Sequence, residues 1–225
     1  MIRILLFAFL SLISLRAVSK DLETIKAKQI DKSSDIYENS IDGYKTNEFW
    51  GIWTVPIGDA FSSSELKPQG QINYSIKNIS DYDLNTAWIE GRTDYGIGER
   101  FGFGFTFNFP KNTEYGGAYQ FYGTINLFNG YCKSLETWQQ NSRVWKLKVY
   151  YNDTPVCIVE LLDTWHFQYF DIGKFFKYKR DKKYMDAPFE IKQGDKLTFE
   201  ILDIYAGTKY KDVAISEFMA KGAGN

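Results

Sequence analysis

Two segments far apart in the sequence carry oxygen-rich side chains of the kind that bind hard cations. Residues 81–90 read Asp-Tyr-Asp-Leu-Asn-Thr-Ala-Trp-Ile-Glu, and a second carboxylate, Glu217, ends the segment Asp-Val-Ala-Ile-Ser-Glu. Ca²⁺ takes about six to eight oxygen ligands, mostly from carboxylates and carbonyls. A fold that brings its first and last strands together would join Asp81, Asp83 and Thr86 to Glu217, which predicts a structural Ca²⁺ site. The alternative is an Asx turn in which Asp81 bonds its own backbone.

A second group of residues has the chemistry of a sugar site. Sugar rings stack on aromatic side chains, and their hydroxyls bond to amides, carboxylates and guanidinium groups, as in small-ligand pockets generally. Five such residues lie in or beside one expected loop: Asn129, Tyr131, Trp138, Asn141 and Arg143. The alternative is structural: a turn at residues 129–130, aromatic packing on the core, and an ion pair for Arg143.

Catalysis has little support in the sequence. His166 is the only histidine, and a single histidine among aromatic residues is more often a packing residue than a general base. Carboxylate pairs such as Glu90 with Asp94, or Asp83 with Glu99, could mimic a glycosidase dyad. With 28 acidic residues in the chain such pairs arise by chance. We therefore expect a protein that is not an enzyme.

Charge excludes one class of partner and leaves another open. The net charge of −1 gives no general attraction to nucleic acid. Locally, the segment Lys174–Lys183 carries six basic residues among aromatics. Such a segment could contact a polyanion, although a run of this kind is usually a solvated loop.

The composition and the spacing of apolar residues predict an all-β domain. Aromatic residues make up 18% of the chain, and these favour strands. Phe occupies alternate positions from Phe101 to Phe109, which is the period of a strand with one buried face. Further strands are expected at residues 119–128, 144–151, 156–162, 166–172, 197–205 and 213–219, separated by turn residues. This pattern predicts a sandwich or jelly roll.

The N-terminal region has the pattern of an export signal. Arg3 precedes a 12-residue apolar run, residues 4–15, and Ala17-Val-Ser19 is a small-residue cleavage pattern. We expect residues 1–19 to be removed, residues 20–48 to form a polar extension, and residues 49–220 to form the domain. An oxidising compartment would allow Cys132 and Cys157 to form a disulfide, if their positions in the fold permit it.

Several motifs in order along residues 73–218 resemble one known family, the NADase-type glycan-binding domain of the discoidin-like, galactose-binding-like β-sandwiches. The matching segments are Asn78–Asp81, Asn85–Glu90, Gly96–Glu99, Asn129–Lys133, Asn141–Arg143 with the strand that follows it, Leu162-Asp163 with Gln168, and Asp203–Glu217. The resemblance implies a jelly-roll sandwich of about eight strands and a role in binding carbohydrate. In the toxin that names the family the module precedes an NAD glycohydrolase, for which we expect no room in 225 residues.

One position departs from the family. Discoidin-like sequences usually have Gly after the first Asp of the turn, where this chain has Tyr82. Tyrosine rarely adopts a positive φ, so we expect the loop and its cation site to differ.

Together these observations predict an exported bacterial protein, secreted or periplasmic. It would be a non-catalytic carbohydrate-binding module that recognises a glycan on the cell envelope or on a host surface. The alternative is a structural or protein-interaction β-sandwich of the envelope that binds no sugar.

Overall fold

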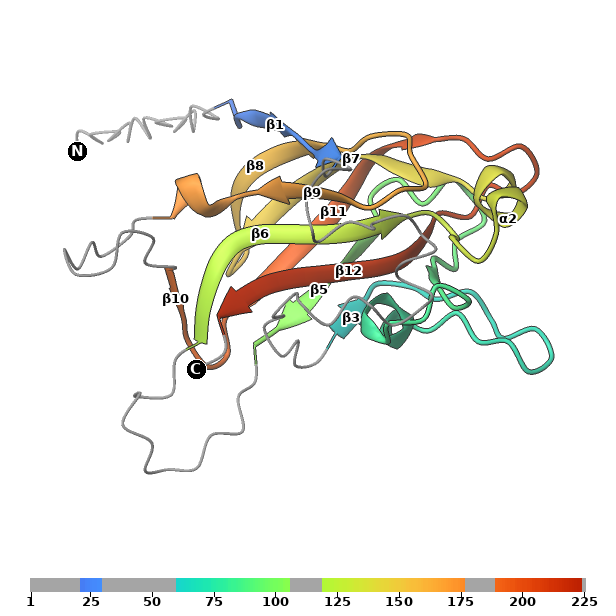
Figure 1. Cartoon of the computed structure of the whole chain (residues 1–225), viewed down its shortest axis with the longest axis horizontal. Helices are drawn as coiled ribbons and strands as arrows, with labels where there is room; N and C mark the ends of the chain where they lie inside the picture. Colours follow the sequence, from blue (N-terminus) through green and yellow to red (C-terminus); the bar gives the residue numbers. More distant parts are fainter. Residues whose placement is uncertain (1–20, 30–59, 106–118, 177–188, 224–225) are drawn as a thin grey trace, which may run out of the picture.

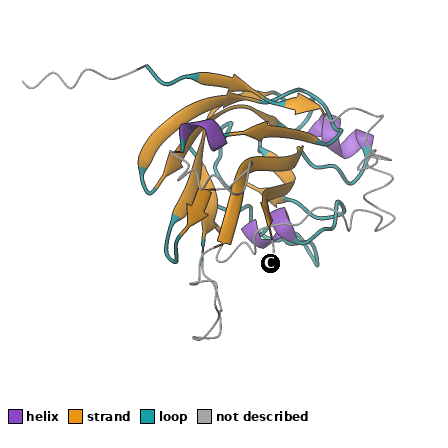
Figure 2. Cartoon of the chain, turned by 60° about the vertical axis from the view of Figure 1, so that its left-hand side comes forward, coloured by secondary structure: helices purple, strands orange, loops and turns teal. Residues whose placement is uncertain are grey.

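The computed structural model describes residues 21–29, 60–105, 119–176, 189–223, and these form a β-sandwich of two sheets (Figures 1 and 2). One sheet has the strand order β1-β8-β7-β11-β5-β3. Its strands are β1 (Thr24–Lys26), β3 (Ala60–Ser62), β5 (Arg100–Gly104), β7 (Arg143–Tyr151), β8 (Thr154–Glu160) and β11 (Lys196–Tyr205). All neighbouring strands are antiparallel except β1 and β8.

The second sheet has the order β2-β9-β6-β12-β4, with β10 also paired to β6. Its strands are β2 (Lys28–Gln29), β4 (Trp88–Ile89), β6 (Tyr119–Asn129), β9 (Gln168–Asp171), β10 (Phe189–Ile191) and β12 (Ala214–Ala223). Among the described residues, three short helices join the strands: η1 (Ile76–Ser80), α2 (Leu135–Gln140) and η2 (Gly173–Phe175). The expected all-β sandwich is confirmed, and each expected strand from residue 119 onward overlaps an observed one.

Aromatic rings from both sheets fill the space between them. Phe101 and Phe103 point inward from β5 and are fully buried, as the alternation of Phe predicts. They meet Phe199 of β11 and Phe218 of β12, whose ring centroids lie 4.7 Å apart. Gly102 lies between them because a Cβ at this position would sit 2.0 Å from the carbonyl oxygen of Leu197. Residues 106–109 of the expected Phe-rich strand lie outside the described residues.

The N-terminal segment belongs partly to the domain, which corrects the expected boundary. Residues 20–48 were expected to form a polar extension, but β1 pairs with β8 and β2 pairs with β9. Between these two strands Ala27 is 5% exposed, and its N–H donates to the carbonyl of Glu160 at 2.8 Å. The chain therefore crosses from one sheet to the other at this residue. Alternating charges along a strand that presents few apolar side chains concealed this in the sequence.

The two cysteines do not form a disulfide. Neither is part of a disulfide and both are fully buried, but they belong to different apolar clusters. Cys157 lies on β8 in the main core, whereas Cys132 packs with Phe128 and Phe167 in a separate cluster. Burial raises the pKa of the Cys157 thiol to about 12. The disulfide considered from the sequence is therefore absent.

The expected export signal, residues 1–19, lies outside the described residues, as does most of the segment 20–48. Within the ranges given above, no helix is long and apolar enough to cross a membrane.

The position of Ala27 gives a test of where the domain begins. Ala27→Asp should lower the free energy of unfolding by about 2 kcal/mol or more, because it buries a carboxylate without a partner. Lys28→Asp, at the exposed neighbouring position, is the control and should change stability little. Urea unfolding followed by tryptophan fluorescence measures both. Equal and small effects would show that this segment is loosely attached.

Candidate functional site

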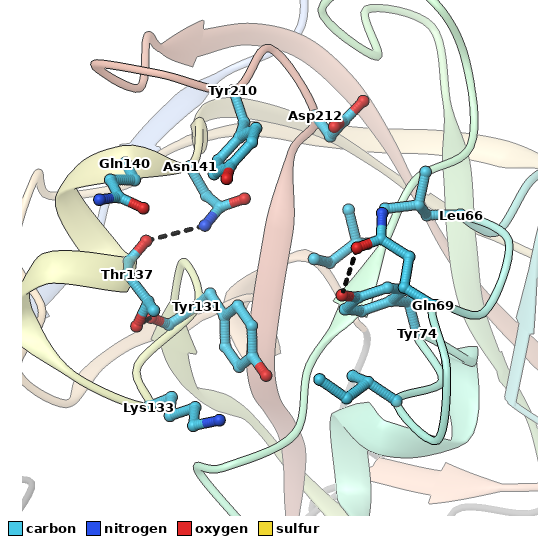
Figure 3. Close-up of a pocket in the computed structure, with 12 residues that line it drawn as sticks. Leu66, Gln69, Tyr74, Tyr131, Lys133, Thr137, Gln140, Asn141, Tyr210 and Asp212 are labelled. Carbon is cyan, nitrogen blue, oxygen red and sulfur yellow. Dashed lines mark hydrogen bonds between the residues drawn. The ribbon is translucent and has the colours of Figure 1, made fainter.

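A pocket of about 250 Å³ opens at the end of the sandwich that carries α2 (Figure 1). Twelve residues line it (Figure 3). They come from the loop before η1, from β4, from α2 and its flanks, and from the chain leading into β12. The residues are Leu66, Gln69, Ile72, Tyr74, Ile89, Tyr131, Lys133, Thr137, Gln140, Asn141, Tyr210 and Asp212.

Three tyrosine rings form much of the wall. Tyr131 is held by a hydrogen bond of 2.9 Å from its hydroxyl to the carbonyl of Asn85. Tyr74 donates from its hydroxyl to the side-chain oxygen of Gln69 at 3.5 Å. Both residues are nearly buried, whereas Tyr210 is 41% exposed. The pocket thus offers two fixed rings and one at its rim.

The polar groups on one side are positioned by α2. A capping box fixes its first turn: Ser134 accepts from the N–H of Thr137, and the Thr137 hydroxyl accepts from the N–H of Ser134. At the other end the Asn141 side-chain amide donates to the carbonyl of Thr137 at 2.8 Å. A helix of six residues is too short to be stable alone, so these caps hold Thr137, Gln140 and Asn141 at the pocket.

Two of the five residues expected to bind glycan line this pocket, Tyr131 and Asn141. The other three support the loop. Asn129 is fully buried, and its amide bridges both backbone groups of Val144 at 2.7 and 3.1 Å. Trp138 donates from its ring nitrogen to the carbonyl of Asn129 at 2.8 Å.

Arg143 is the centre of this support. Its guanidinium forms a bidentate ion pair with Asp163 and donates to the carbonyls of Trp138 and Asn141. It also lies 4.2 Å from the centre of the Trp138 ring. At 6% exposure, this side chain has its hydrogen-bonding capacity used within the protein, which agrees with the structural alternative.

Carboxyl groups gather behind the opposite wall. Asp212 lines the pocket, and burial raises the pKa of its carboxyl. Behind it lies Glu90, fully buried, which accepts from the N–H of Arg92 at 2.7 Å and of Val213 at 3.3 Å. Burial, with smaller contributions from the charges of Asp212 and Glu99, raises the pKa of Glu90 to about 7.

The oxygen-rich turn meets the last strand as expected. The Thr86 hydroxyl donates to the Asp81 carboxylate at 2.7 Å, and Ser216 donates to the carbonyl of Thr86 at 3.1 Å. Partial burial raises the pKa of Asp81, which is in hydrogen-bonding contact with Glu217. Asp83 instead turns its carboxylate toward the backbone and side-chain N–H groups of Asn85. The turn also contains the Asx bond considered above, from the N–H of Asp83 to Asp81.

These residues fit a cation, because Glu217 is fully buried beside a second carboxyl group. Two adjacent carboxylates are costly unless a cation or a shared proton compensates them. Asp81, Glu217 and the oxygens of Thr86 are the groups that would hold Ca²⁺. Among the described residues no three or more His, Cys, Asp or Glu side chains form a metal cluster, so carbonyl and hydroxyl oxygens would supply the remaining ligands.

Tyr82 has a positive φ, although tyrosine rarely adopts one and we expected the loop to differ for that reason. Its φ is 60°, the left-handed region that favours glycine. This costs a non-glycine residue about 1 to 2 kcal/mol. The bonds of Asp81 to Asp83 and Thr86 on either side hold the turn closed and offset that cost. The turn therefore has a positive φ at the position where a glycine was expected.

Other residues considered from the sequence lie apart from the pocket lining. His166 is half-buried beside the Trp165 ring, at a centroid distance of 6.0 Å. Lys174, the first residue of the basic segment, forms an ion pair with Glu23. Residues 177–183 of that segment lie outside the described residues.

Sequence reasoning missed most of the pocket. Gln69, Tyr74, Lys133, Thr137, Gln140, Tyr210 and Asp212 line it, but none was named as a glycan-binding residue. They come from three segments, and the first and the last of these are separated by more than half the length of the chain. The available signal was the pair Tyr210 and Asp212, which lies in the motif just before the last strand.

Comparison with known proteins agrees with this architecture. A family model described as "NAD glycohydrolase translocation F5/8 type C domain" matches residues 54–221. The chain belongs to this family. Its F5/8 type C domains are discoidin-like modules of a translocation or binding type, not catalytic domains. No curated protein matches the sequence.

Among solved structures, one similar chain is described as "CBM32-3 from a family 31 glycoside hydrolase from Clostridium perfringens". The sequence identity is 15% and the TM-score is 0.46, over 72% of this chain and 88% of that chain.

The buried Glu90 of this F5/8 type C domain should make its stability depend on pH. The unfolded chain releases the Glu90 proton near pH 4.5 and the folded chain near pH 7. The folded state therefore holds this proton more tightly, and stability is lost as pH rises between these values, by on the order of 2 kcal/mol. Glu90→Gln should remove this part of the pH dependence.

Urea unfolding at a series of pH values from about 4 to 8 measures the effect. Glu136→Gln, on the exposed face of α2, is the control and should retain the slope. An unchanged slope in Glu90→Gln would show that folding does not raise the pKa of Glu90.

Proposed function

We propose that this domain is a non-catalytic carbohydrate-binding module and that the pocket beside α2 binds the glycan. The observation that carries the proposal is the lining itself: tyrosine rings at Tyr74, Tyr131 and Tyr210 surround amide, hydroxyl and carboxylate groups. Rings offer flat apolar faces to sugar C–H groups, and the polar groups can bond hydroxyls. Membership of a discoidin-like family agrees with binding rather than chemistry.

The size of the pocket limits what it holds. Its volume of about 250 Å³ is below the range of about 300 to 1,000 Å³ that is usual for drug-sized ligands. One sugar residue, at a chain end or as a branch, fits this space better than an extended polysaccharide. If the expected export signal directs the chain out of the cell, this recognition would take place on the envelope or on a host surface.

Protein binding is the competing function, and one observation favours it. Ile72 and Leu135 are each 46% exposed, one in the pocket lining and one at the start of α2. Exposed apolar side chains at a pocket rim are common at protein interfaces. Silence toward all glycans from a folded protein would favour this alternative.

A glycan array probed with residues 20–225 tests the proposal, followed by affinity measurement on any ligand found. Tyr210→Ala should weaken binding about tenfold, because it removes a ring worth about 1 kcal/mol or more in stacking. Tyr95→Ala is a matched control. The two tyrosines have similar exposure, and each lies under a lysine ammonium group, but Tyr95 is outside the pocket lining. Equal effects of the two substitutions would place the glycan elsewhere.

We also propose that Asp81, Thr86 and Glu217 hold a structural Ca²⁺ ion. Ca²⁺ at a hundred times its dissociation constant should then raise the free energy of unfolding by about 2.7 kcal/mol. Chelator should reverse the gain, and Glu217→Gln should abolish it, while Glu136→Gln should respond like the original chain. Thermal unfolding with and without Ca²⁺ measures this. A native protein indifferent to Ca²⁺ would indicate that Asp81 and Glu217 share a proton instead.

A further inference from the structure

The pocket has a single acidic residue among the twelve that line it, Asp212. Its one basic residue, Lys133, lies at the opposite end, with the Tyr131 ring between them (Figure 3). The pocket therefore has an acidic side chain at the end beside β12 and a basic side chain at the end beside α2. Different parts of a bound sugar would therefore contact the acidic end and the basic end.

Asp212 is placed where its charge is poorly compensated. None of the ion pairs in the described part of the chain includes Asp212. The two nearest lysines in sequence place their ammonium groups over tyrosine rings. Lys211 lies 5.4 Å from the centre of the Tyr95 ring, and Lys209 lies 4.9 Å from that of Tyr210. The Asp212 carboxylate is partly buried at the wall, and no cation among the described residues forms an ion pair with it.

Two further carboxyl groups lie close to this wall of the pocket. Glu90 lies directly behind it and is fully buried, and Glu99 beyond is 4% exposed. Arg92 is the cation of this group, but its guanidinium is paired with Asp94 at 2.7 Å and lies 3.8 Å from Glu99. Glu90 also bonds the N–H of Val213, the residue after Asp212. The Glu90 carboxyl group thus holds the backbone of the segment that carries Asp212.

We propose that the pocket selects a sugar with an unsubstituted amino group, whose ammonium pairs with Asp212 while the ring packs against the tyrosines. The inference rests on the proposed glycan-binding function and names its ligand class. A neutral hydroxyl would leave the charge of Asp212 uncompensated, whereas an ammonium neutralises it. Charge-assisted hydrogen bonds are about twice as strong as neutral ones. An N-acetylated sugar has lost this charge and carries extra bulk into a small pocket.

The experiment compares matched sugars that differ only at the amine. Glucosamine, galactosamine and mannosamine are each titrated against their N-acetyl forms, using the full chain and ligand-observed NMR. At about pH 6 the free amines are protonated. At least one amino sugar should bind about tenfold more tightly than its N-acetyl form, a difference of about 1.4 kcal/mol.

Two substitutions of equal charge change locate the effect. Asp212→Asn keeps the shape of the side chain and should abolish the preference for the free amine. Asp153→Asn, in the hairpin between β7 and β8, should preserve it. Asp153 has φ 63°, a conformation that Asn also tolerates, so the control should fold normally. Circular dichroism and thermal unfolding check both variants.

The outcomes separate this inference from the proposed function. If N-acetylated or neutral sugars bind as well as amino sugars, and Tyr210→Ala weakens them, the glycan site stands and the selectivity for amines is wrong. If Asp153→Asn lowers the preference as much as Asp212→Asn, general electrostatics explain it, and the inference is overturned. If no sugar binds to a folded chain, both proposals fail.

Discussion

The pairing of β12 with its neighbours is the constraint on which the rest of this domain depends. This strand lies between β6 and β4, so its backbone groups must be satisfied on both edges, and its register is fixed. Adjacent side chains on a strand point to opposite faces of the sheet. Phe218 enters the core, while Glu217 faces the turn that contains Asp81. Ser216 ties the two regions together, since it accepts from the N–H of Cys132 and donates to the carbonyl of Thr86.

The same strand begins at the pocket, and this links the stability of the fold to the shape of the site. The N–H of Ala214 donates to the carbonyl of Ser142, and the N–H of Gly130 donates to the carbonyl of Ala214. These bonds bring the end of β6, the start of β7 and the start of β12 to one point. Arg143 fills the space beside them and joins Asp163 to the carbonyls after α2. A buried guanidinium satisfied in this way is a rigid support, and it lets small loops hold ligand-contacting groups in place.

Buried carboxyl groups are unusually frequent at this end of the molecule. Glu90, Glu99 and Glu217 are all less than 5% exposed, although acidic side chains are rarely buried so fully. Burial removes the hydration of their ionised forms, which makes ionisation less favourable and raises the pKa of Glu90. Proteins retain such groups mainly where they serve a site. Glu90 and Glu99 lie behind the wall of the pocket, and Glu217 lies where the turn before β4 meets β12.

The alternation of Phe101 and Phe103 predicted a strand with one buried face, and the repeated strand signals along the chain predicted the sandwich. The sequence also predicted that Asp81 and Thr86 could meet Glu217, and in the structure the turn that holds them precedes β4, which pairs with β12. Tertiary structure decided the rest. Asn129 and Arg143 have side chains that could bind a sugar. In the fold they are buried and donate to nearby backbone carbonyls, so they support the loop instead. The pocket joins loops about 140 residues apart, such as those of Gln69 and Tyr210. Their proximity follows from strand order, which local propensity does not encode.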